Sequence, residues 1–389
     1  MNILFTSTVF PHARDRTRGT YNRELAAALA AEHDVRVVAP VAWREAIKTL
    51  DRRTDDDPPG VPVARPAYWY LPKVRPQSLG RRLFAANRRG LRQIAAGWKP
   101  DLVVSYWLYP DAWAGQEVAD ALGARHATIV GGSDVLKLPH EPKRGPLVRD
   151  VLARCDTALA VSQQLVDAIH QVDPSTHAVN WSQGIRTETL HPGDAAEARQ
   201  RLGWPVDVPT FLWVGRMVGV KALPRLIEAF AALQRTTPSR LVLVGGGPSQ
   251  AGAVEAAAAA GVSDRVHFAG PIAPAALGDW YRACDAVVLS SDSEGLPNVL
   301  REGLACGRPF ASSHVGGIGE IGEDDCRVLA RPGDVASLTD AMQTVLAGRF
   351  RQAAEARPVR TWATAASDLL AAVESSPTAA PPASVSVAN

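Results

Sequence analysis

Short runs of β-branched apolar residues alternate with longer stretches rich in alanine and leucine, and this rhythm occurs twice along the chain. Such alternation of strand and helix is typical of parallel sheets that helices cover on both faces. We therefore expect an α/β fold with two Rossmann-like, doubly wound domains that face each other across a cleft. The predicted strands are residues 3–8, 35–39, 102–106, 127–130 and 158–161 in the first half, and 210–214, 241–244, 266–269, 286–289 and 309–312 in the second.

The chain of 389 residues is too long for one ordinary domain and suits two. Glycine and proline gather between the two sets of strands, which is typical of an irregular connection. Near the end, a segment rich in Ser, Pro and Ala has no aromatic residue, so we expect a disordered tail. The predicted boundaries are an N-terminal domain at 1–185, a C-terminal domain at 186–358, a helix at 359–373 and the tail at 374–389.

Composition excludes several other classes of protein. The four cysteines lie far apart without a CxxC pair, which excludes a disulfide scaffold and the usual zinc ribbons. The formal net charge of +2 gives no indication of a nucleic-acid partner. No apolar run has the length of a membrane span, and the start lacks the features of a signal peptide. We therefore expect a cytoplasmic protein with reduced thiols.

The segment at 290–302 carries two carboxylates around the start of a helix. Glu294 falls in the loop after the last strand before it, and Glu302 falls within the helix. The free N–H groups and the dipole of a helix N-terminus favour an anion between them. This combination suits a nucleotide-diphosphate sugar, whose hydroxyls bind the carboxylates and whose diphosphate binds the helix end. Two solvated glutamates beside a tight turn fit the same spacing.

A second segment, at 214–221, follows an apolar strand and carries two cations. The guanidinium of Arg216 suits phosphate oxygens, and the ammonium of Lys221 acts as a mobile point charge. Lys221 is the single lysine after Lys143 in a chain that otherwise uses arginine, which indicates that its geometry matters. A surface loop with two cations is the alternative.

Glycines at two further positions permit close approach of a ligand to the backbone. One is the cluster at 244–248, which also fits a tight turn, and the other is Gly19, which also fits the start of a helix. Two other patterns are interpreted as false matches. The GxGxxG at 317–322 lacks the strand and helix context of a dinucleotide site. The residue types at Asp55, Asp56 and Asp57 match the metal-binding motif DxD. We interpret this segment as a solvated turn, so we expect no metal.

Together these segments resemble the retaining glycosyltransferases of family 4, which have the GT-B fold. The resemblance covers roughly residues 1–372 and is densest at 208–330, with the family signature at 266–270, 281–285, 294–309 and 315–321. It also accounts for the GxGxxG match. In a GT-B chain the final helix returns to the first domain, so the helix at 359–373 is expected there.

The resemblance implies a role for each matched residue. Arg216 and Lys221 would bind the donor diphosphate and stabilise it as the leaving group, while Glu294 would contact hydroxyls of the transferred sugar. Glu302 would hold the ribose, and Gly19 would face the diphosphate from the first domain. The implied catalytic residues are Arg216, Lys221 and Glu294, and the implied substrate-binding residues are Gly19, Asp134, Gly295, Leu296, Asn298, Val299 and Glu302. No cofactor is implied beyond the nucleotide-diphosphate sugar, which is the donor substrate.

Three positions depart from the family pattern. The motif His-Gly-x-Asp reads Gly131-Gly132-Ser133-Asp134 here, so the histidine near sugar and acceptor is missing. The glycine that usually follows the lysine is Ala222. The usual Asn-Gly-Val-Asp of the linker reads Gln-Gly-Ile-Arg at 183–186. The donor site remains intact, and the acceptor side is the part that these changes affect.

The resemblance implies that the acceptor binds the first domain, where residues 58–100 contain nine basic residues and no acidic one. Leucines among these arginines predict a basic amphipathic helix, which is typical of membrane-surface or anionic-ligand binding. A solvated helix packed by its leucines is the alternative. The sequence thus predicts a transferase at the inner membrane face, with a lipid-linked or phosphorylated saccharide as acceptor, and the resemblance implies that it retains configuration. A transferase for a small soluble acceptor and a non-catalytic nucleotide-sugar-binding protein remain open.

Overall fold

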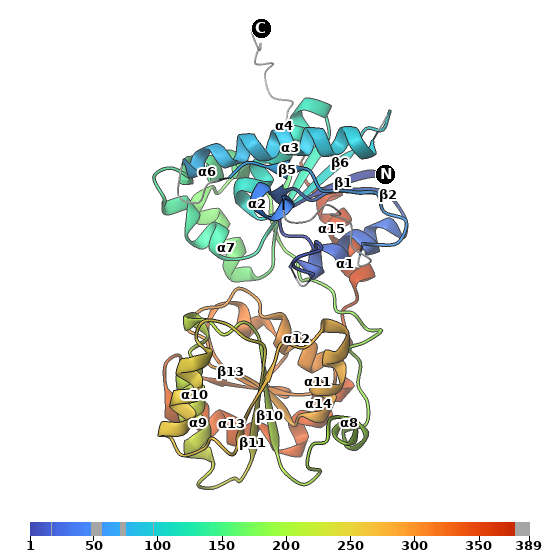
Figure 1. Ribbon diagram of the computed structural model, residues 1–389. Helices are drawn as coiled ribbons and strands as arrows, with labels where there is room; N and C mark the ends of the chain where they lie inside the picture. Colours follow the sequence, from blue (N-terminus) through green and yellow to red (C-terminus); the bar gives the residue numbers. More distant parts are fainter. Residues whose placement is uncertain (17, 48–56, 71–74, 96, 378–389) are drawn as a thin grey trace. The chain divides into compact units, whose positions relative to one another are not determined.

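The computed structural model describes residues 1–16, 18–47, 57–70, 75–95 and 97–377 (Figure 1). The chain divides into two compact units. The first comprises Met1–Gly184 and the segment from Trp362 onward, and the second comprises Ile185–Thr361. The boundaries expected at residues 185 and 358 thus lie close to the observed ends of the second unit.

The first unit is built on a seven-stranded parallel sheet with the order β4-β2-β1-β6-β7-β8-β9. Every residue of β6 is buried, because helices cover both faces of the sheet. The strands are β1 (Asn2–Thr6), β2 (Asp34–Val38), β4 (Val63–Ala64), β6 (Leu102–Tyr106), β7 (Arg125–Val130), β8 (Thr157–Ala160) and β9 (Ala178–Asn180). A separate pair, β3 (Val41–Ala42) and β5 (Ala67–Tyr68), was not predicted.

Helices of the first unit pack in pairs, with α3 and α4 on one side of the sheet and α1 and α15 on the other (Figure 1). The indole N–H of Trp181 donates to the carbonyl of Ala365 in α15 at 2.8 Å, which ties the final helix to this unit. The longer helices are α1 (Thr20–Ala30), α3 (Leu79–Ile94), α4 (Trp113–Leu122), α6 (Gly145–Arg154), α7 (Gln163–Val172) and α15 (Trp362–Ser375), and the short ones are α2 (Trp43–Ala46) and α5 (Ser133–Leu136).

The prediction of a disordered tail from residue 374 was wrong at its start. Helix α15 continues through Glu374 and Ser375, and Ser376 is buried with its hydroxyl donating to the carbonyl of Asp156. Local composition does not reveal such a tertiary hydrogen bond, so the sequence placed the boundary too early. Residues 378–389 lie outside the described part of the chain.

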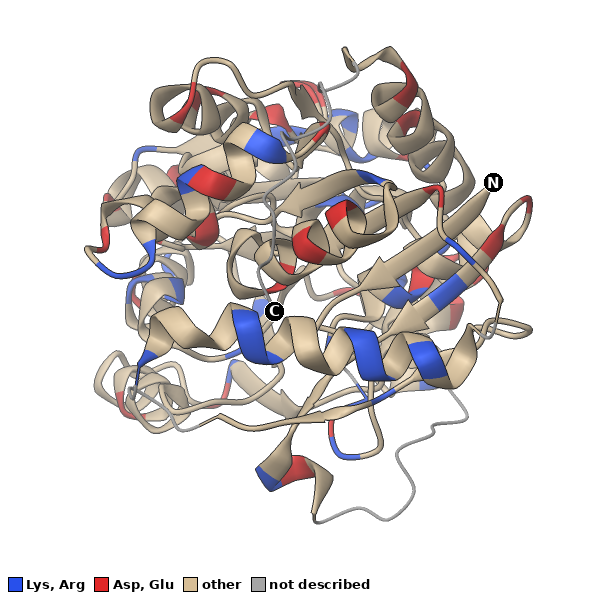
Figure 2. Cartoon of the chain, turned by 90° about the horizontal axis from the view of Figure 1, so that it is seen from above, with Lys and Arg blue, Asp and Glu red and all other residues tan. Residues whose placement is uncertain are grey.

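The basic segment forms α3, and its two faces separate as the amphipathic pattern predicts. Leu83 is buried, and Leu91 and Ile94 pack against a hydrophobic cluster of the unit. Arg81 and Arg88 are exposed, and Figure 2 shows basic positions along the outer side of this helix. Because its leucines belong to the protein core, the exposed face of α3 carries arginines and no apolar stripe.

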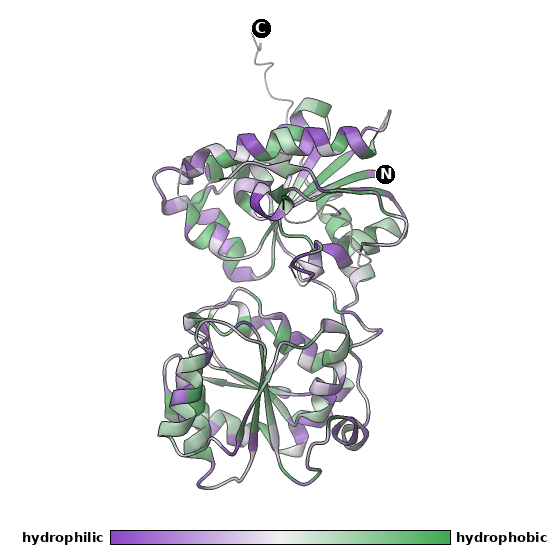
Figure 3. Ribbon diagram, viewed as in Figure 1, coloured by the Kyte–Doolittle hydropathy of each residue, from purple (hydrophilic) through white to green (hydrophobic). Residues whose placement is uncertain are grey.

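The second unit is built on a six-stranded parallel sheet with the order β12-β11-β10-β13-β14-β15. Its strands are strongly hydrophobic between helices with polar outer positions (Figure 3). The strands are β10 (Thr210–Val214), β11 (Arg240–Val244), β12 (Val266–Gly270), β13 (Ala286–Leu289), β14 (Phe310–Ser313) and β15 (Arg327–Ala330). The helices are α8 (Ala195–Leu202), α9 (Leu223–Leu233), α10 (Gln250–Ala259), α11 (Leu277–Ala283), α12 (Asn298–Ala305), α13 (Val335–Val345) and α14 (Gly348–Ala356).

Two further features concern membrane-spanning helices and the state of the cysteines. In the described ranges, no helix combines the length and the apolar character needed to cross a bilayer. The four cysteines are buried free thiols.

A buried arginine connects three segments of the second unit. The side chain of Arg308 has 0% exposure, and its guanidinium donates to the carbonyls of Arg282 at 2.7 Å and Gly193 at 3.2 Å. It also lies 3.2 Å from the carboxylate of Glu355. Burial lowers the pKa of Arg308, so the cation depends on these acceptors for its stability.

We expect Arg308→Met to destabilise the second unit by about 3 kcal/mol, because it leaves buried acceptors without donors. The midpoint of urea unfolding measures this change. The control is Arg265→Met, which removes an exposed pair with Asp264 and should change the free energy of unfolding by less than about 0.5 kcal/mol. Equal midpoints for Arg308→Met and the wild type would contradict the structural role.

Candidate functional site

The predicted site residues of the second unit gather where the strand order of its sheet reverses. The chain proceeds from β10 through β11 to β12 and then crosses to β13 on the other side of β10. In doubly wound sheets, ligands bind beyond the carboxyl ends of the strands at such a switch point. The loop after β10 carries Arg216 and Lys221, and the loop after β13 carries Glu294.

The glycine cluster after β11 lets that loop contact the loop after β10 through backbone alone. A Cβ on Gly245 would lie 1.9 Å from the carbonyl oxygen of Gly215. The N–H of Met217 donates to the carbonyl of Gly246 at 2.9 Å. The cluster therefore permits close backbone approach, as one of the two interpretations predicts, but the partner is the protein loop that carries Arg216.

Hydrogen bonds also connect the loops after β10 and β13. The N–H of Asp292 donates to the carbonyl of Val220 at 2.8 Å, and the hydroxyl of Ser290 donates to the carbonyl of Lys221 at 2.9 Å. The guanidinium of Arg225 in α9 donates to the carboxylate of Asp292 at 2.6 Å. The backbone around Lys221 is thus held by the neighbouring loop.

Two of the predicted catalytic side chains form an ion pair. Nζ of Lys221 lies 2.6 Å from Oε1 of Glu294, and the hydroxyl of Ser291 donates to the same oxygen at 2.6 Å. The exposed fractions of the Lys221 and Glu294 side chains are 21% and 10%, so the pair is shielded but reachable. Leu296, further along the loop, is half-buried against the hydrophobic core and anchors it.

The start of α12 offers a place for an anion beside this pair. Helix α12 begins at Asn298, and its N-cap residue is Pro297, whose side chain has no polar atom to cap the first N–H groups. Such N–H groups and the helix dipole favour negative charge. The side chain of Asn298 accepts from Arg301 at 3.1 Å, and Val299 packs against the core. The contacts of their backbone N–H groups with a phosphate stay predictions. Arg216 is exposed.

Glu302, on the same helix, is positioned by a buried tyrosine. The hydroxyl of Tyr281 donates to Oε2 of Glu302 at 2.6 Å. Burial raises the pKa of Glu302, whereas this hydrogen bond and the cations Arg186 and Arg301 lower it. A carboxylate can accept several hydrogen bonds, so Glu302 can still accept from a hydroxyl of a ligand. Its contact with ribose stays a prediction.

The segment that matches GxGxxG supports the loop after β13. It forms a 3₁₀ turn, η6 (Gly316–Glu320), between β14 and β15. Gly316 has φ +60, and a Cβ there would lie 1.9 Å from the carbonyl oxygen of Glu294. The N–H of Gly317 donates to the carbonyl of Gly295 at 2.8 Å. No α-helix follows the glycines directly, which agrees with the interpretation as a false match for a dinucleotide site.

Gly19 and Asp134, the other two predicted site residues, belong to the first unit. Gly19 precedes α1 with φ 63, and a Cβ there would lie 2.2 Å from the carbonyl oxygen of Val9. Asp134 is buried, and its carboxylate accepts from the N–H groups of Gly132 at 2.7 Å and Leu108 at 3.2 Å. Local packing thus accounts for both residues, and their contacts with substrate stay predictions.

The position of the missing histidine is crowded by aromatic side chains. A Cβ on Gly131 would lie 2.7 Å from the hydroxyl of Tyr106 and 3.4 Å from the ring of Trp107. The ring of Tyr106 lies 5.0 Å from that of Tyr21 between centroids. A larger residue at position 131 would displace Tyr106, which explains the glycine.

Ser291 and Tyr281 are the residues that the sequence analysis missed as partners of the two glutamates. Both lie in the segments quoted there, but nothing in their spacing indicates that they meet a carboxylate. In the described ranges, no group of His, Cys, Asp and Glu is arranged to hold a metal ion. Asp55 and Asp56 lie outside those ranges, and Asp57 accepts from buried Arg65 at 2.9 Å.

Solved structures share this architecture over nearly the whole chain. Sucrose-phosphate synthase from Thermosynechococcus elongatus superimposes with a TM-score of 0.75 at 20% identity, covering 95% of this chain and 98% of that one. HepE of Anabaena, solved with UDP-glucose, gives a TM-score of 0.72 at 18% identity, covering 96% and 100%. The two doubly wound parallel sheets thus form the fold of the GT-B glycosyltransferases.

Sequence comparisons identify the family. The family model described as Glycosyl transferases group 1 matches residues 208–348, and the Glycosyl transferase 4-like domain matches residues 18–180. The chain belongs to the group 1 glycosyltransferases.

Two curated relatives illustrate the range of this family. A D-inositol 3-phosphate glycosyltransferase of Frankia alni is 38% identical over 47% of each chain, so the match spans about half of that relative. The putative teichuronic acid biosynthesis glycosyltransferase TuaC of Bacillus subtilis is 26% identical over 88% of each chain.

Ala222 occupies a backbone conformation that strains alanine, at a position where the family usually has glycine. It follows Lys221 with φ 47 and ψ 45, the left-handed conformation that glycine adopts without strain. We expect Ala222→Gly to stabilise the second unit by about 1 kcal/mol and to raise its Tm by roughly 2–4 °C in a thermal melt.

The matched control is Ala258→Gly, at an exposed position of α10, which should lower stability by about 1 kcal/mol. A decrease of Tm in Ala222→Gly as large as in this control would show that position 222 carries no strain.

Proposed function

We propose that the protein transfers a sugar from a nucleotide-diphosphate sugar to an acceptor hydroxyl, with retention of configuration and without a metal ion. The observation that supports this proposal most directly is the Lys221–Glu294 pair at 2.6 Å, at the switch point of the second sheet. It combines a cation for a departing phosphate with a carboxylate for sugar hydroxyls.

In this mechanism the bond between the anomeric carbon and the diphosphate breaks, and the acceptor oxygen bonds to the same face of that carbon. Arg216, Lys221 and the N–H groups at the start of α12 stabilise the charge on the leaving diphosphate. A phosphate oxygen of the leaving group takes the proton of the acceptor hydroxyl. Glu294 holds hydroxyls of the transferred sugar, and Glu302 holds the ribose.

The proposed acceptor is a lipid-linked or phosphorylated saccharide in polysaccharide or glycolipid biosynthesis. The names of two relatives support this class, since one acts in teichuronic acid biosynthesis by its description and the other on D-inositol 3-phosphate. The exposed arginines of α3 could attract an anionic surface at the inner face of a membrane. A small soluble acceptor is the second candidate, because Thr8, Arg18, Arg44 and Glu45 of the first unit line a cavity large enough for a small molecule.

A thermal-shift panel with UDP, GDP, ADP and NAD in the presence of a chelator tests the donor site. UDP is the first probe, because HepE has been solved with UDP and UDP-glucose. A ligand at a hundred times its Kd adds about 2.7 kcal/mol, which corresponds to roughly 5–10 °C for a unit of this size. We expect one nucleoside diphosphate to stabilise the protein. A response to NAD alone would contradict the proposal, and binding without turnover of any sugar would favour a non-catalytic protein.

We expect Lys221→Ala to lower the rate of sugar transfer, or of donor hydrolysis, at least about a hundredfold, because the leaving group loses a preorganised cation. The control is Lys143→Ala, which removes an exposed lysine of the first unit. A Lys221→Ala protein as active as this control would exclude the proposed role of Lys221.

A further inference from the structure

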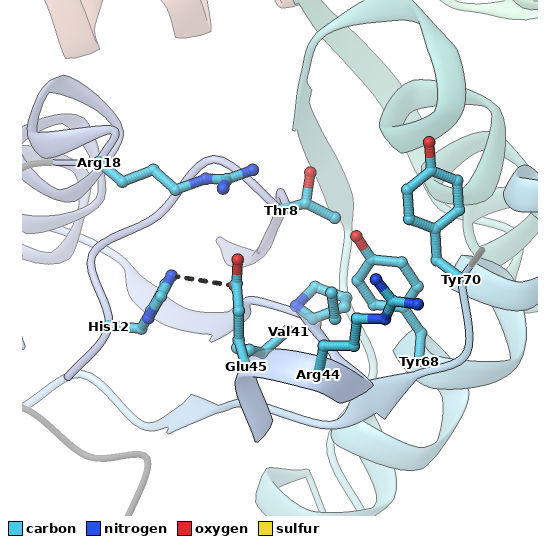
Figure 4. A pocket seen from close by; sticks show the side chains of 10 residues that line it. Thr8, His12, Arg18, Val41, Arg44, Glu45, Tyr68 and Tyr70 are labelled. Carbon is cyan, nitrogen blue, oxygen red and sulfur yellow. Dashed lines mark ion pairs between the residues drawn. The ribbon is translucent and has the colours of Figure 1, made fainter. Parts of the chain in front are cut away.

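The first unit contains a cavity of about 270 Å³, just below the roughly 300 Å³ at which the usual size range of small-molecule sites begins. None of the residues predicted for donor binding lines it. Thr8, His12, Arg18, Glu45, Tyr68 and Tyr70 are the side chains that give it chemical character (Figure 4).

The walls of the cavity come from the segments that follow β1 and β2, together with β5. Strand β3 pairs with β5, which joins Ala42 to Tyr68. Thr8 is held by Asp111, since its hydroxyl donates to the Asp111 carboxylate at 3.1 Å and its N–H donates to the other oxygen. Burial raises the pKa of Asp111 to about 6. Because these hydrogen bonds fix Thr8 in place, the polar wall is preorganised, which favours binding.

The charge of the lining is positive. Arg18 and Arg44 both line the cavity, and neither forms an ion pair with any carboxylate of the described residues. Glu45 is the one carboxylate in the lining, and its Oε2 lies 3.5 Å from Nε2 of His12. Figure 4 shows Arg18 above Glu45 and Arg44 to its right, near Tyr68. The lining therefore contains two guanidinium groups and a single carboxylate, which already has a partner.

The histidine lies beside that carboxylate as a neutral ring. The backbone N–H of Arg14 donates to Nδ1 of His12 at 3.4 Å, which leaves the proton on Nε2, facing Glu45. Burial lowers the pKa of His12, which favours the uncharged ring. Glu45 can thus accept from a ligand hydroxyl.

Two tyrosines complete the lining. Tyr68 and Tyr70 present rings and hydroxyls, a combination that suits a ring carrying several hydroxyl groups. Burial raises the pKa of Tyr68, so its hydroxyl remains a donor. The cavity therefore offers two cations for an anionic group and several neutral groups for hydroxyls.

We propose that this cavity binds the phosphate-bearing sugar or polyol that accepts the transferred residue. Arg18 and Arg44 bind the phosphate ester, and Thr8, Glu45 and Tyr68 bind the ring hydroxyls. The inference rests on the proposed function, because it names the acceptor of that reaction. The same phosphate chemistry serves a soluble phosphate ester and a lipid-borne one, so the experiment distinguishes the two sources.

Calorimetric titration of the full chain saturated with UDP tests the cavity, with inositol monophosphate as the soluble probe. Inositol and inorganic phosphate are the matched partial probes, and polyprenyl phosphate in neutral detergent micelles is the lipid probe. We expect inositol monophosphate to bind more tightly than either partial probe. We expect Arg18→Met to weaken this binding at least about tenfold, because a charge-assisted contact is lost.

Arg14→Met is the matched control, since Arg14 lies on the same loop and does not line the cavity. It should bind like the wild type. If Arg18→Met fails to fold, the exposed Arg44→Met provides the second variant. Binding of the lipid probe alone, with the same dependence on Arg18, would support the cavity and assign the phosphate to a lipid.

Affinities that are equal in Arg18→Met, Arg44→Met and the wild type, or no binding of any phosphate ester, would overturn the inference. UDP binding is measured first in the same samples. It shows whether the donor site binds a nucleotide, independently of the cavity. A protein that binds UDP but no phosphate ester refutes the cavity alone. If no nucleoside diphosphate binds, the proposed function fails, and titration without nucleotide then decides the cavity.

Discussion

Direct backbone contact between neighbouring loops is the constraint on which the site of the second unit depends. A side chain at Gly245 would collide with the backbone of Gly215, and one at Gly316 would collide with that of Glu294. Because these glycines carry no Cβ, the loops after β10, β11, β13 and β14 can lie against one another. Their mutual support holds Lys221 and Glu294 at hydrogen-bonding distance although the two residues are far apart in the chain.

Both sheets place a polar contact across the point where their strand order reverses. In the first unit, Thr8 follows β1 and binds Asp111, which follows β6, and these strands are neighbours. In the second unit, Lys221 and Glu294 follow the neighbouring strands β10 and β13. Helices that leave adjacent strands in opposite directions open a space there, so polar side chains remain reachable by a ligand. The two units use the same topology for different chemistry, a hydroxyl–carboxylate contact in one and an ion pair in the other.

Departures from the family pattern are accommodated by their immediate surroundings. At Gly131 the hydroxyl of Tyr106 occupies the space into which a side chain would project. At Ala222 the backbone keeps the left-handed conformation that the family's glycine would adopt freely. In each case the residues around the changed position fit the side chain that this sequence carries.

The sequence by itself determined the two parallel sheets, nearly all their central strands and the loops that carry Arg216, Lys221 and Glu294. These features follow from hydrophobic periodicity and from motifs that are continuous in the chain. The pairing of Lys221 with Glu294, the support of Glu302 by Tyr281 and the cavity of the first unit were decided by tertiary structure alone. They depend on contacts between residues distant in sequence, such as the short pairing of β3 with β5, whose two-residue strands carry no periodic signal.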